Sequence, residues 1–251
     1  MAGDATWRGE NNVLVVVAAP AEAKAVASGL GCSPPERDRE PVDAGDGWRL
    51  LRSGVGKVNA AGAVTRWLPH AGPQPIVLNL GVCGSLPHAN APPPLLSVVV
   101  ASACTYADEG AITPAGFVDT AALGFPMWDG AHSANGHCPA ISTDAHLRQA
   151  LAGALRSELG SALRVGPIAT VSTCSGTDAS ATDAAARTGA LAEAMEGAAI
   201  AHALGPRAGV APGFAEIRVV SNTTGDRDRQ TWDLPGSLAV LTRVASLLRS
   251  A

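Results

Sequence analysis

A run of seven apolar residues, Val13–Ala19, constrains the fold of this chain more than any other feature. The run is far shorter than the ~20 apolar residues that span a bilayer, and its valines favour a strand buried on both faces. Similar short strands are predicted at Pro75–Leu80, Leu95–Ala103 and Phe214–Val220. Helical segments separate them, which predicts an α/β fold with a mixed, mostly parallel central sheet between two layers of helices.

The remaining elements fit one domain over residues 13–250, preceded by a disordered or poorly ordered N-terminus at residues 1–12. The stretch Asp108–Pro139 is expected to be largely irregular, and NLGVCGSL (Asn79–Leu86) to turn after its strand. Two further strands are predicted at Trp48–Arg52 and Arg164–Val171. Helices are predicted at Ala21–Leu30, Val58–Leu68, Asp144–Leu159, Ala179–Arg187, Ala192–Leu204 and Leu238–Arg249.

Charge and cysteine usage exclude several classes of protein. The chain has 18 Lys+Arg against 22 Asp+Glu and no basic tract, so no nucleic-acid partner is expected. Its cysteines are odd in number and form no C-x-x-C pair, which argues against a disulfide framework or a zinc site. A reducing compartment fits this pattern, and the N-terminal residues are not expected to form a signal peptide, because no basic segment is followed by an apolar one. We therefore expect a cytoplasmic protein that has no membrane partner and needs no metal or cofactor.

Polar residues follow several predicted strands, at the sheet edge where open α/β proteins bind ligands. Glu22 follows the first strand, and an acid there either caps the next helix or serves a site. Gly81 and Gly84 would permit close backbone approach to a ligand, but taken alone this loop is better explained as a simple tight turn.

Three more polar residues stand in apolar surroundings. Glu196 either faces solvent at a helix start or is buried, in which case it must be paired. Arg218 lies inside an apolar strand and needs a buried anion or acceptor. Asn222, at the end of that strand, is either a turn residue or a planar donor and acceptor suited to the edge of a heteroaromatic base.

Taken together, these clusters resemble the purine nucleoside phosphorylase and nucleosidase superfamily, from Val13 to about Leu248. Within it, the chain is similar to nucleosidases that release hypoxanthine in menaquinone biosynthesis. The segments that carry the resemblance are VSTCSGT (Val171–Thr177), ALAEAMEGAA (Ala190–Ala199), SNTTGDRDRQTW (Ser221–Trp232) and ADEGAITPAGFVDTAALGFP (Ala107–Pro126).

The resemblance implies a nucleoside substrate whose N-glycosidic bond breaks through an oxocarbenium-like transition state. Glu22 would hold and deprotonate the attacking water, and Arg218 would steady both. Met195 would pack beneath the ribose, while Glu196 would accept hydrogen bonds from its hydroxyls. Asn222 would donate to O6 and accept from the protonated N7 of a 6-oxopurine, whereas adenine-specific relatives carry aspartate there.

The resemblance also implies further substrate contacts and a homo-oligomer, a dimer or larger. Phe117 and Phe125 would be lid or cross-subunit contacts, with an ordinary surface loop as the alternative. Cys83 is expected to be a small core residue rather than a nucleophile. The further substrate-binding residues expected are Gly81, Val82, Cys83, Gly84, Thr173, Cys174 and Phe117.

Hydrolysis is expected rather than phosphorolysis, because phosphorylases of this superfamily place an arginine in the first loop and Ala18–Lys24 has none. Two alternatives stand beside a 6-oxopurine nucleosidase. A methylthioadenosine or adenosylhomocysteine nucleosidase is disfavoured by Asn222. A non-catalytic nucleoside-binding protein is disfavoured because Glu22, Glu196 and Arg218 are all present.

Overall fold

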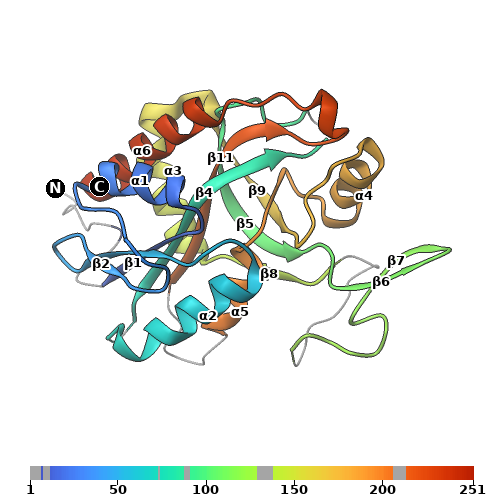
Figure 1. Cartoon of the computed structure of the whole chain (residues 1–251), viewed down its shortest axis with the longest axis horizontal. Coiled ribbons are helices and arrows are strands. Elements are labelled where there is room, and N and C mark those ends of the chain that lie inside the picture. Colours follow the sequence, from blue (N-terminus) through green and yellow to red (C-terminus); the bar gives the residue numbers. More distant parts are fainter. Residues whose placement is uncertain (1–6, 8–11, 73, 88–90, 129–137, 206–212) are drawn as a thin grey trace.

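The computed structural model describes residues 7, 12–72, 74–87, 91–128, 138–205 and 213–251. Most of the segment expected to be poorly ordered, residues 1–12, lies outside these ranges. A nine-stranded mixed sheet forms the centre of the molecule (Figure 1). Its strands are β1 (Val13–Val17), β2 (Val42–Asp43), β3 (Trp48–Arg52), β4 (Ile76–Ser85), β5 (Val98–Tyr106), β8 (Ala140–Ser142), β9 (Leu163–Thr170), β10 (Ala192–Ala194) and β11 (Gly213–Thr223).

Two blocks of parallel strands make up this sheet, apart from the short strands β2 and β8, which pair antiparallel with β3 and β5. Strands β3, β1, β4 and β11 run parallel to one another, as do β5, β9 and β10. The blocks meet where β11 pairs antiparallel with β5. The short strand β10 also pairs antiparallel with β4, so β4, β11, β5, β9 and β10 close into a ring. This closure brings residues from both ends of the chain to one place.

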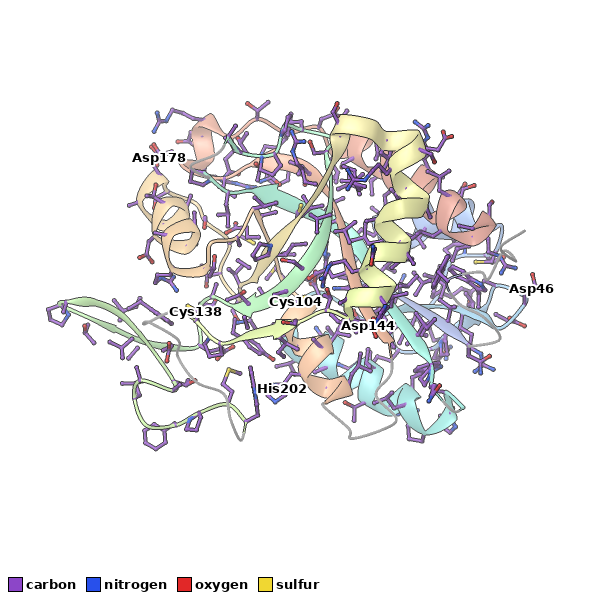
Figure 2. All side chains as sticks on the ribbon, turned by 180° about the vertical axis from the view of Figure 1, so that it is seen from behind. Asp46, Cys104, Cys138, Asp144, Asp178 and His202 are labelled. Atoms are coloured by element: carbon purple, nitrogen blue, oxygen red, sulfur yellow. The ribbon has the colours of Figure 1, made fainter. Side chains whose placement is uncertain are left out.

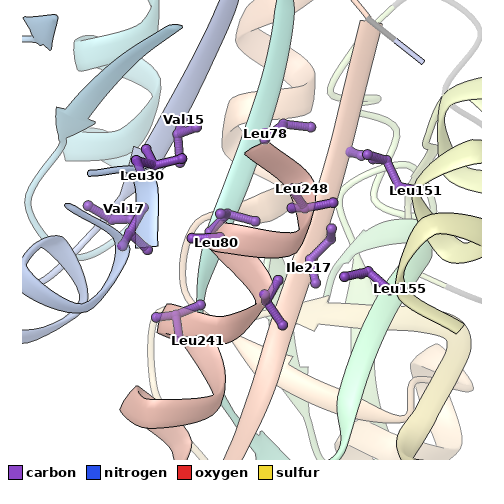
Figure 3. Packing of buried hydrophobic residues seen from close by; sticks show 14 of the residues in the cluster. Val15, Val17, Leu30, Leu78, Leu80, Leu151, Leu155, Ile217, Leu241 and Leu248 are labelled. Atoms are coloured by element: carbon purple, nitrogen blue, oxygen red, sulfur yellow. The ribbon is translucent and has the colours of Figure 1, made fainter. Parts of the chain in front are cut away.

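Helices cover both faces of the sheet, and the two faces can be followed in β1, where every residue is buried. Val13, Val15 and Val17 belong to one apolar cluster, while Leu14 and Val16 belong to another. Helices α1 (Pro20–Leu30), α3 (Ala145–Leu159) and α6 (Leu234–Ser250) pack on the first cluster (Figure 3). Helices α2 (Lys57–Trp67) and α5 (Gly197–Leu204) pack on the second. The expected three-layer αβα architecture is confirmed.

Local signals explain where the helices begin and end. Helix α1 has proline in its first turn and ends at Gly31, whose φ of 72° places it in the left-handed region that glycine tolerates. Helix α3 is capped by Asp144, whose carboxylate accepts from the Leu147 N–H at 2.9 Å. Helix α4 (Asp178–Thr188) begins after Thr177, whose hydroxyl accepts from the Ser180 N–H at 3.1 Å.

Three expectations about local structure were wrong. The segment Gly81–Ser85 continues strand β4, since β11 pairs along it and β10 pairs with its last two residues. The segment Ala192–Ala194 is strand β10 and not the start of a helix, because β9 and β4 flank it. The region expected to be irregular contains a hairpin, β6 (Gly110–Thr113) and β7 (Gly116–Asp119), which projects from the body in Figure 1.

Among the described residues, no helix is both long and apolar enough to cross a lipid bilayer.

Candidate active site

Glu22 lies in the first turn of α1, directly beyond β1, with 5% of its surface exposed. One carboxylate oxygen accepts from the N–H groups of Ala18 at 3.1 Å and Ala19 at 2.8 Å. The other accepts from the Val82 N–H on β4 at 2.8 Å. The glutamate therefore caps its helix and also bridges to the next strand of the sheet. Burial raises the pKa of Glu22, the positive charge of Arg218 opposes that rise, and Glu196 adds to it.

Arg218 is the fully buried cation at the centre of the site, with 1% of its surface exposed. Its Nη2 donates to Glu196 Oε2 at 3.0 Å and its Nε donates to Glu216 Oε1 at 2.8 Å. Nη1 points to the Val82 carbonyl at 3.4 Å. The buried anion that the sequence demanded for Arg218 is thus a pair of carboxylates, which matches the cost of burying an unpaired charge.

Gly81 separates Glu22 from Arg218. A Cβ added at Gly81 would lie 2.4 Å from Arg218 Nη1 and 2.6 Å from Glu22 Oε1. No real side chain tolerates such distances, so only glycine lets the carboxylate and the guanidinium face one another here. Close approach to protein groups, rather than a tight turn, accounts for this glycine.

Glu196 directly precedes α5 and is buried, with 3% of its surface exposed. The solvent-facing alternative is therefore wrong. Its Oε1 accepts from the Gly56 N–H at 2.9 Å, at the start of α2, and its Oε2 accepts from Arg218. The preceding residue, Met195, is half-buried and packs against the apolar cluster that contains Leu86 and Val171.

Asn222 lies at a bulge near the end of β11. Its Nδ2 donates to the Thr223 carbonyl at 2.9 Å, and because a carbonyl only accepts, this bond fixes which way the amide is turned. Its Oδ1 accepts from the Ser221 hydroxyl at 2.9 Å. One amide N–H and one oxygen lone pair stay free for a ligand.

The Asn222 side chain opens into a cleft of about 460 Å³. Residues from β4, β10, β11 and two loops line this cleft: Gly84, Cys174, Ser175, Gly176, Glu193, Asn222, Arg227, Gln230 and Trp232. A hollow of similar size beside α5 is lined by Trp128, His202 and Phe214 and by none of the predicted site residues.

The remaining predicted residues occupy different places. Val82 contributes backbone groups to Glu22 and Arg218, as given above, and Cys174 lines the cleft. Cys83 is buried, and burial raises the pKa of its thiol, which fits a core residue. Thr173 is exposed and donates its N–H to Asp108 at 3.2 Å.

Phe117 is not brought to this group of charges. It lies on the projecting strand β7, and the Arg187 guanidinium of α4 sits 4.2 Å from the centre of its ring. Phe125, the other loop aromatic, is 75% exposed.

The sequence interpretation missed Glu216, a fully buried acid two residues before Arg218 on β11. Residues two apart on a strand share a face, so Glu216 and Arg218 meet directly. Glu216 also accepts from Asn79 Nδ2 at 3.1 Å and from the Cys104 thiol at 2.9 Å. Figure 2 shows Cys104 inside the body of the fold. The signal in the sequence was the acid itself, standing two places from an arginine in an apolar strand.

We expect Glu216→Ala to lower the free energy of unfolding by about 3–5 kcal/mol, because it leaves Arg218 short of a buried partner. Denaturant unfolding would measure this. The matched control is Glu158→Ala, since Glu158 pairs with Arg243 on the surface at 2.7 Å, and exposed pairs contribute no more than ~1 kcal/mol. Equal losses for both variants would show that the buried carboxylate does not stabilise Arg218.

Buried carboxylates and a guanidinium thus lie together in a three-layer αβα fold, and the Asn222 amide, four residues beyond Arg218 on β11, keeps a free edge. The chain matches the phosphorylase superfamily over residues 13–250 and belongs to it. Two curated relatives narrow the comparison within this superfamily. The futalosine hydrolase of Acidothermus cellulolyticus is 39% identical over 240 residues, covering 95% of this chain and 90% of the relative. That of Streptomyces coelicolor is 36% identical, covering 92% of each. The predicted family is confirmed.

Solved structures agree on the fold. A futalosine hydrolase mutant of Helicobacter pylori strain 26695 superposes with a TM-score of 0.69 at 21% identity, covering 95% of this chain and 98% of that one. The 5'-methylthioadenosine/S-adenosylhomocysteine nucleosidase of Neisseria meningitidis, in complex with methylthio-immucillin-A, gives a TM-score of 0.70 at 22% identity, covering 96% and 100%.

Proposed function

We propose that this protein is an N-glycosyl hydrolase that cleaves futalosine into hypoxanthine and dehypoxanthine futalosine. The observation that carries the proposal is the buried group of Glu22, Arg218 and Glu196. The Asn222 amide, four residues beyond Arg218 on β11, opens into a cleft. The identity to curated futalosine hydrolases supports the choice of substrate.

Glu22 is the general base in this proposal. It takes a proton from water as the water oxygen bonds to the anomeric carbon, while the bond from that carbon to the base nitrogen breaks and its electron pair leaves with the base. Three backbone N–H groups hold the carboxylate in place. Its raised pKa makes the ionised form a stronger base than an exposed glutamate.

Glu196 binds the sugar in this proposal, and Arg218 supports Glu196. Glu196 accepts hydrogen bonds from the ribose hydroxyls, and its remaining lone pairs allow this without loss of the Gly56 bond. Arg218 pairs with Glu196 at 3.0 Å and balances the negative charge that Glu22 adds nearby, so that these carboxylates can share one buried site.

Asn222 binds the purine base in this proposal. Its free N–H donates to O6 of hypoxanthine and its free lone pair accepts from the protonated N7. The departing base is a better leaving group when N7 carries a proton, and this kind of assistance contributes about 10²–10⁴-fold.

Water rather than phosphate is the proposed nucleophile. The N–H groups of Ala18 and Ala19, at the end of β1, already bond to the Glu22 carboxylate and are not available to an anion. The carboxylate would also repel phosphate.

We expect hypoxanthine release from futalosine at the same rate in phosphate-free buffer and with added phosphate, with a free sugar hydroxyl in the product. Chromatography of the products would check this. A strict requirement for phosphate, with a sugar 1-phosphate as product, would contradict the proposal.

The second candidate is a methylthioadenosine or adenosylhomocysteine nucleosidase, favoured by the equally good superposition on such an enzyme. Comparing adenine release from methylthioadenosine with hypoxanthine release from futalosine separates the two. The superposition rests on the fold, which these enzymes share, so the amide at Asn222 weighs more.

The same proposal includes a pathway, a cellular compartment and an oligomeric state. The reaction belongs to menaquinone biosynthesis, so a strain without the gene should grow only with added menaquinone. The protein acts in the cytoplasm, which its five cysteines support, since all are described and none is in a disulfide. It forms a homo-oligomer, supported by the exposed side chains of Ile112 (91%) and Phe125 (75%) around the projecting hairpin, and light scattering would measure its mass.

A further inference from the structure

Glu216 is a buried carboxylate that the proposed chemistry does not use. None of its surface is exposed, so it cannot touch a bound nucleoside. It lies two residues before Arg218 on β11 and accepts from the guanidinium Nε at 2.8 Å. Arg218 already has a partner in Glu196 and faces Glu22 across Gly81. A third acid beside one cation is costly to bury, which points to a task beyond pairing.

The chain makes room for this acid at the start of α5. A Cβ added at Gly197 would lie 2.0 Å from Glu216 Oε2, a distance that no side chain tolerates. Gly197 is the first residue of α5 and directly follows Glu196. Only glycine at this position therefore lets the Glu216 carboxylate lie against the helix start, where negative charge is favoured.

Three donors on three strands hold the Glu216 carboxylate. Asn79 Nδ2 of β4 donates to Oε1 at 3.1 Å, and the Arg218 Nε donates to the same oxygen. The Cys104 thiol of β5 donates to Oε2 at 2.9 Å. All three partners donate, which suits a charged carboxylate. Glu216 is thus a fixed anion behind the guanidinium.

This fixed anion acts on the charge of Arg218. Burial lowers the pKa of Arg218, but the nearby acids raise it by more, and Glu216 contributes more to that rise than Glu196 or Glu22. Without Glu216, the positive charge of the guanidinium would be balanced only by the other two acids. Glu22 would then be a weaker base, and the site would oppose positive charge on the sugar.

Two thiols and one further acid lie around this charged group. The thiols are Cys83 on β4 and Cys104 on β5, and burial raises the pKa of both, so they stay protonated and uncharged. The acid is Glu193 on β10, which acts on Cys83. Neither thiol can therefore balance the guanidinium in place of Glu216.

We propose that Glu216 is a positioning residue that acts through Arg218: it holds the guanidinium by Nε and cancels its charge, so that the two acids beside it direct their negative charge at the sugar. Those acids are Glu22 and Glu196. This inference rests on the proposed function and deepens it. The sugar becomes cationic as its bond to the base breaks, and preorganised negative charge lowers the barrier to that change.

The test uses Glu216→Gln, which removes the charge and keeps the shape. The glutamine oxygen can take the place of Oε1, which accepts from both Asn79 and Arg218. Its amide can then face the Cys104 sulfur, a weak acceptor. The matched control is Glu158→Gln, on the surface of α3. For each protein, kcat and KM for futalosine are measured as a function of pH, and thermal unfolding verifies the fold.

In Glu216→Gln, the acidic limb of kcat/KM should move to lower pH by about one unit. The limb follows the ionisation of Glu22, and loss of a nearby negative charge favours that ionisation, so the pKa of Glu22 falls. On the plateau, kcat should fall about 10-fold, because one pKa unit corresponds to a tenfold change in the interaction between charges. KM should change much less, since Glu216 does not touch the substrate. The control should match wild type.

A second variant, Glu216→Asp, keeps the charge and shortens the side chain. Its free energy of unfolding should fall, yet it should keep the wild-type limb and most of kcat. This variant decides the matter if Glu216→Gln fails to fold. A limb that moves to lower pH in Glu216→Asp, or a kcat that falls 10-fold with it, would show that the charge is not what counts and would overturn the inference.

Two other results would also overturn it. If Glu216→Gln folds and its acidic limb stays in place, or if kcat and KM change together at every pH, Glu216 only stabilises the fold. If wild type releases no hypoxanthine from futalosine, the proposed function fails and the inference falls with it. If hypoxanthine is released and the limb alone is unmoved, only the inference fails.

Discussion

Replacing Glu22 with glutamine is expected to lower kcat by about 10²–10⁴-fold, the range for loss of a general base. Glutamine is nearly the same size but cannot take a proton from water. Substrate affinity should change much less, because Glu22 acts on water and not on the nucleoside. Single-turnover measurements with excess enzyme would separate the chemical step from binding.

The pH profile gives a second test of Glu22. A general base works only when ionised, so activity should rise as pH increases through the pKa of Glu22. Burial raises this pKa, and the acidic limb should therefore lie above the ordinary range of a glutamate. The limb should vanish in Glu22→Gln.

Folding must be checked for this variant. The new amide group would meet either the Val82 N–H or the N–H groups of Ala18 and Ala19, leaving donors face to face. Thermal unfolding and hypoxanthine binding show whether the site survives. A well-folded variant with wild-type turnover would leave Glu22 only its role as a helix cap.

The second large effect is expected from Asn222→Asp. The variant should lose activity on futalosine by about 5- to 150-fold, because the donor to O6 disappears. It should gain on 6-amino nucleosides, because a carboxyl group can accept from the amine. The two changes multiply, so the ratio of kcat/KM values should move by about 10²-fold or more.

The Thr223 carbonyl should make the activity of Asn222→Asp depend on protonation of the new carboxyl. In the native protein it accepts from Asn222 Nδ2 at 2.9 Å, and an ionised aspartate would instead place two oxygens together. The variant should therefore work best when this carboxyl is protonated. Gln149→Glu, an exposed amide-to-acid change on α3, is the matched control. If the ratio of the two kcat/KM values is unchanged, Asn222 has only a structural role.

Much of the fold could be predicted from local sequence. Apolar β-branched runs mark β1 and the start of β5, and proline and glycine mark the ends of α1, because these signals act within a few residues. The end of β4 and the whole of β10 could not be predicted in this way. Their pairing partners are remote in the sequence, so glycine looked like a turn and Ala192–Ala194 like a helix.

The candidate site, too, could be predicted only in part from local sequence. Glu22, Glu196, Arg218 and Asn222 stood out because each was polar in an apolar context, and the structure brings the first three together. The burial of Glu193 could not be predicted, because it arises from the neighbouring strands β4 and β9, a relation that no local pattern records. The roles of all of these residues stay predictions until the variants are measured.

The extra pairing of β10 with β4 has a consequence for how the protein folds. Joining strands so remote in sequence carries a large loop-closure entropy, so we expect this ring to close late, after the sheet around β1 and β4 has formed. With only three residues, β10 should also be among the first strands to open in native-state hydrogen exchange. A ligand bound in the cleft that Glu193 of β10 and Asn222 of β11 line would hold the ring closed. Ligand binding would then slow exchange at the Ala192–Ala194 amides far more than in the rest of the sheet.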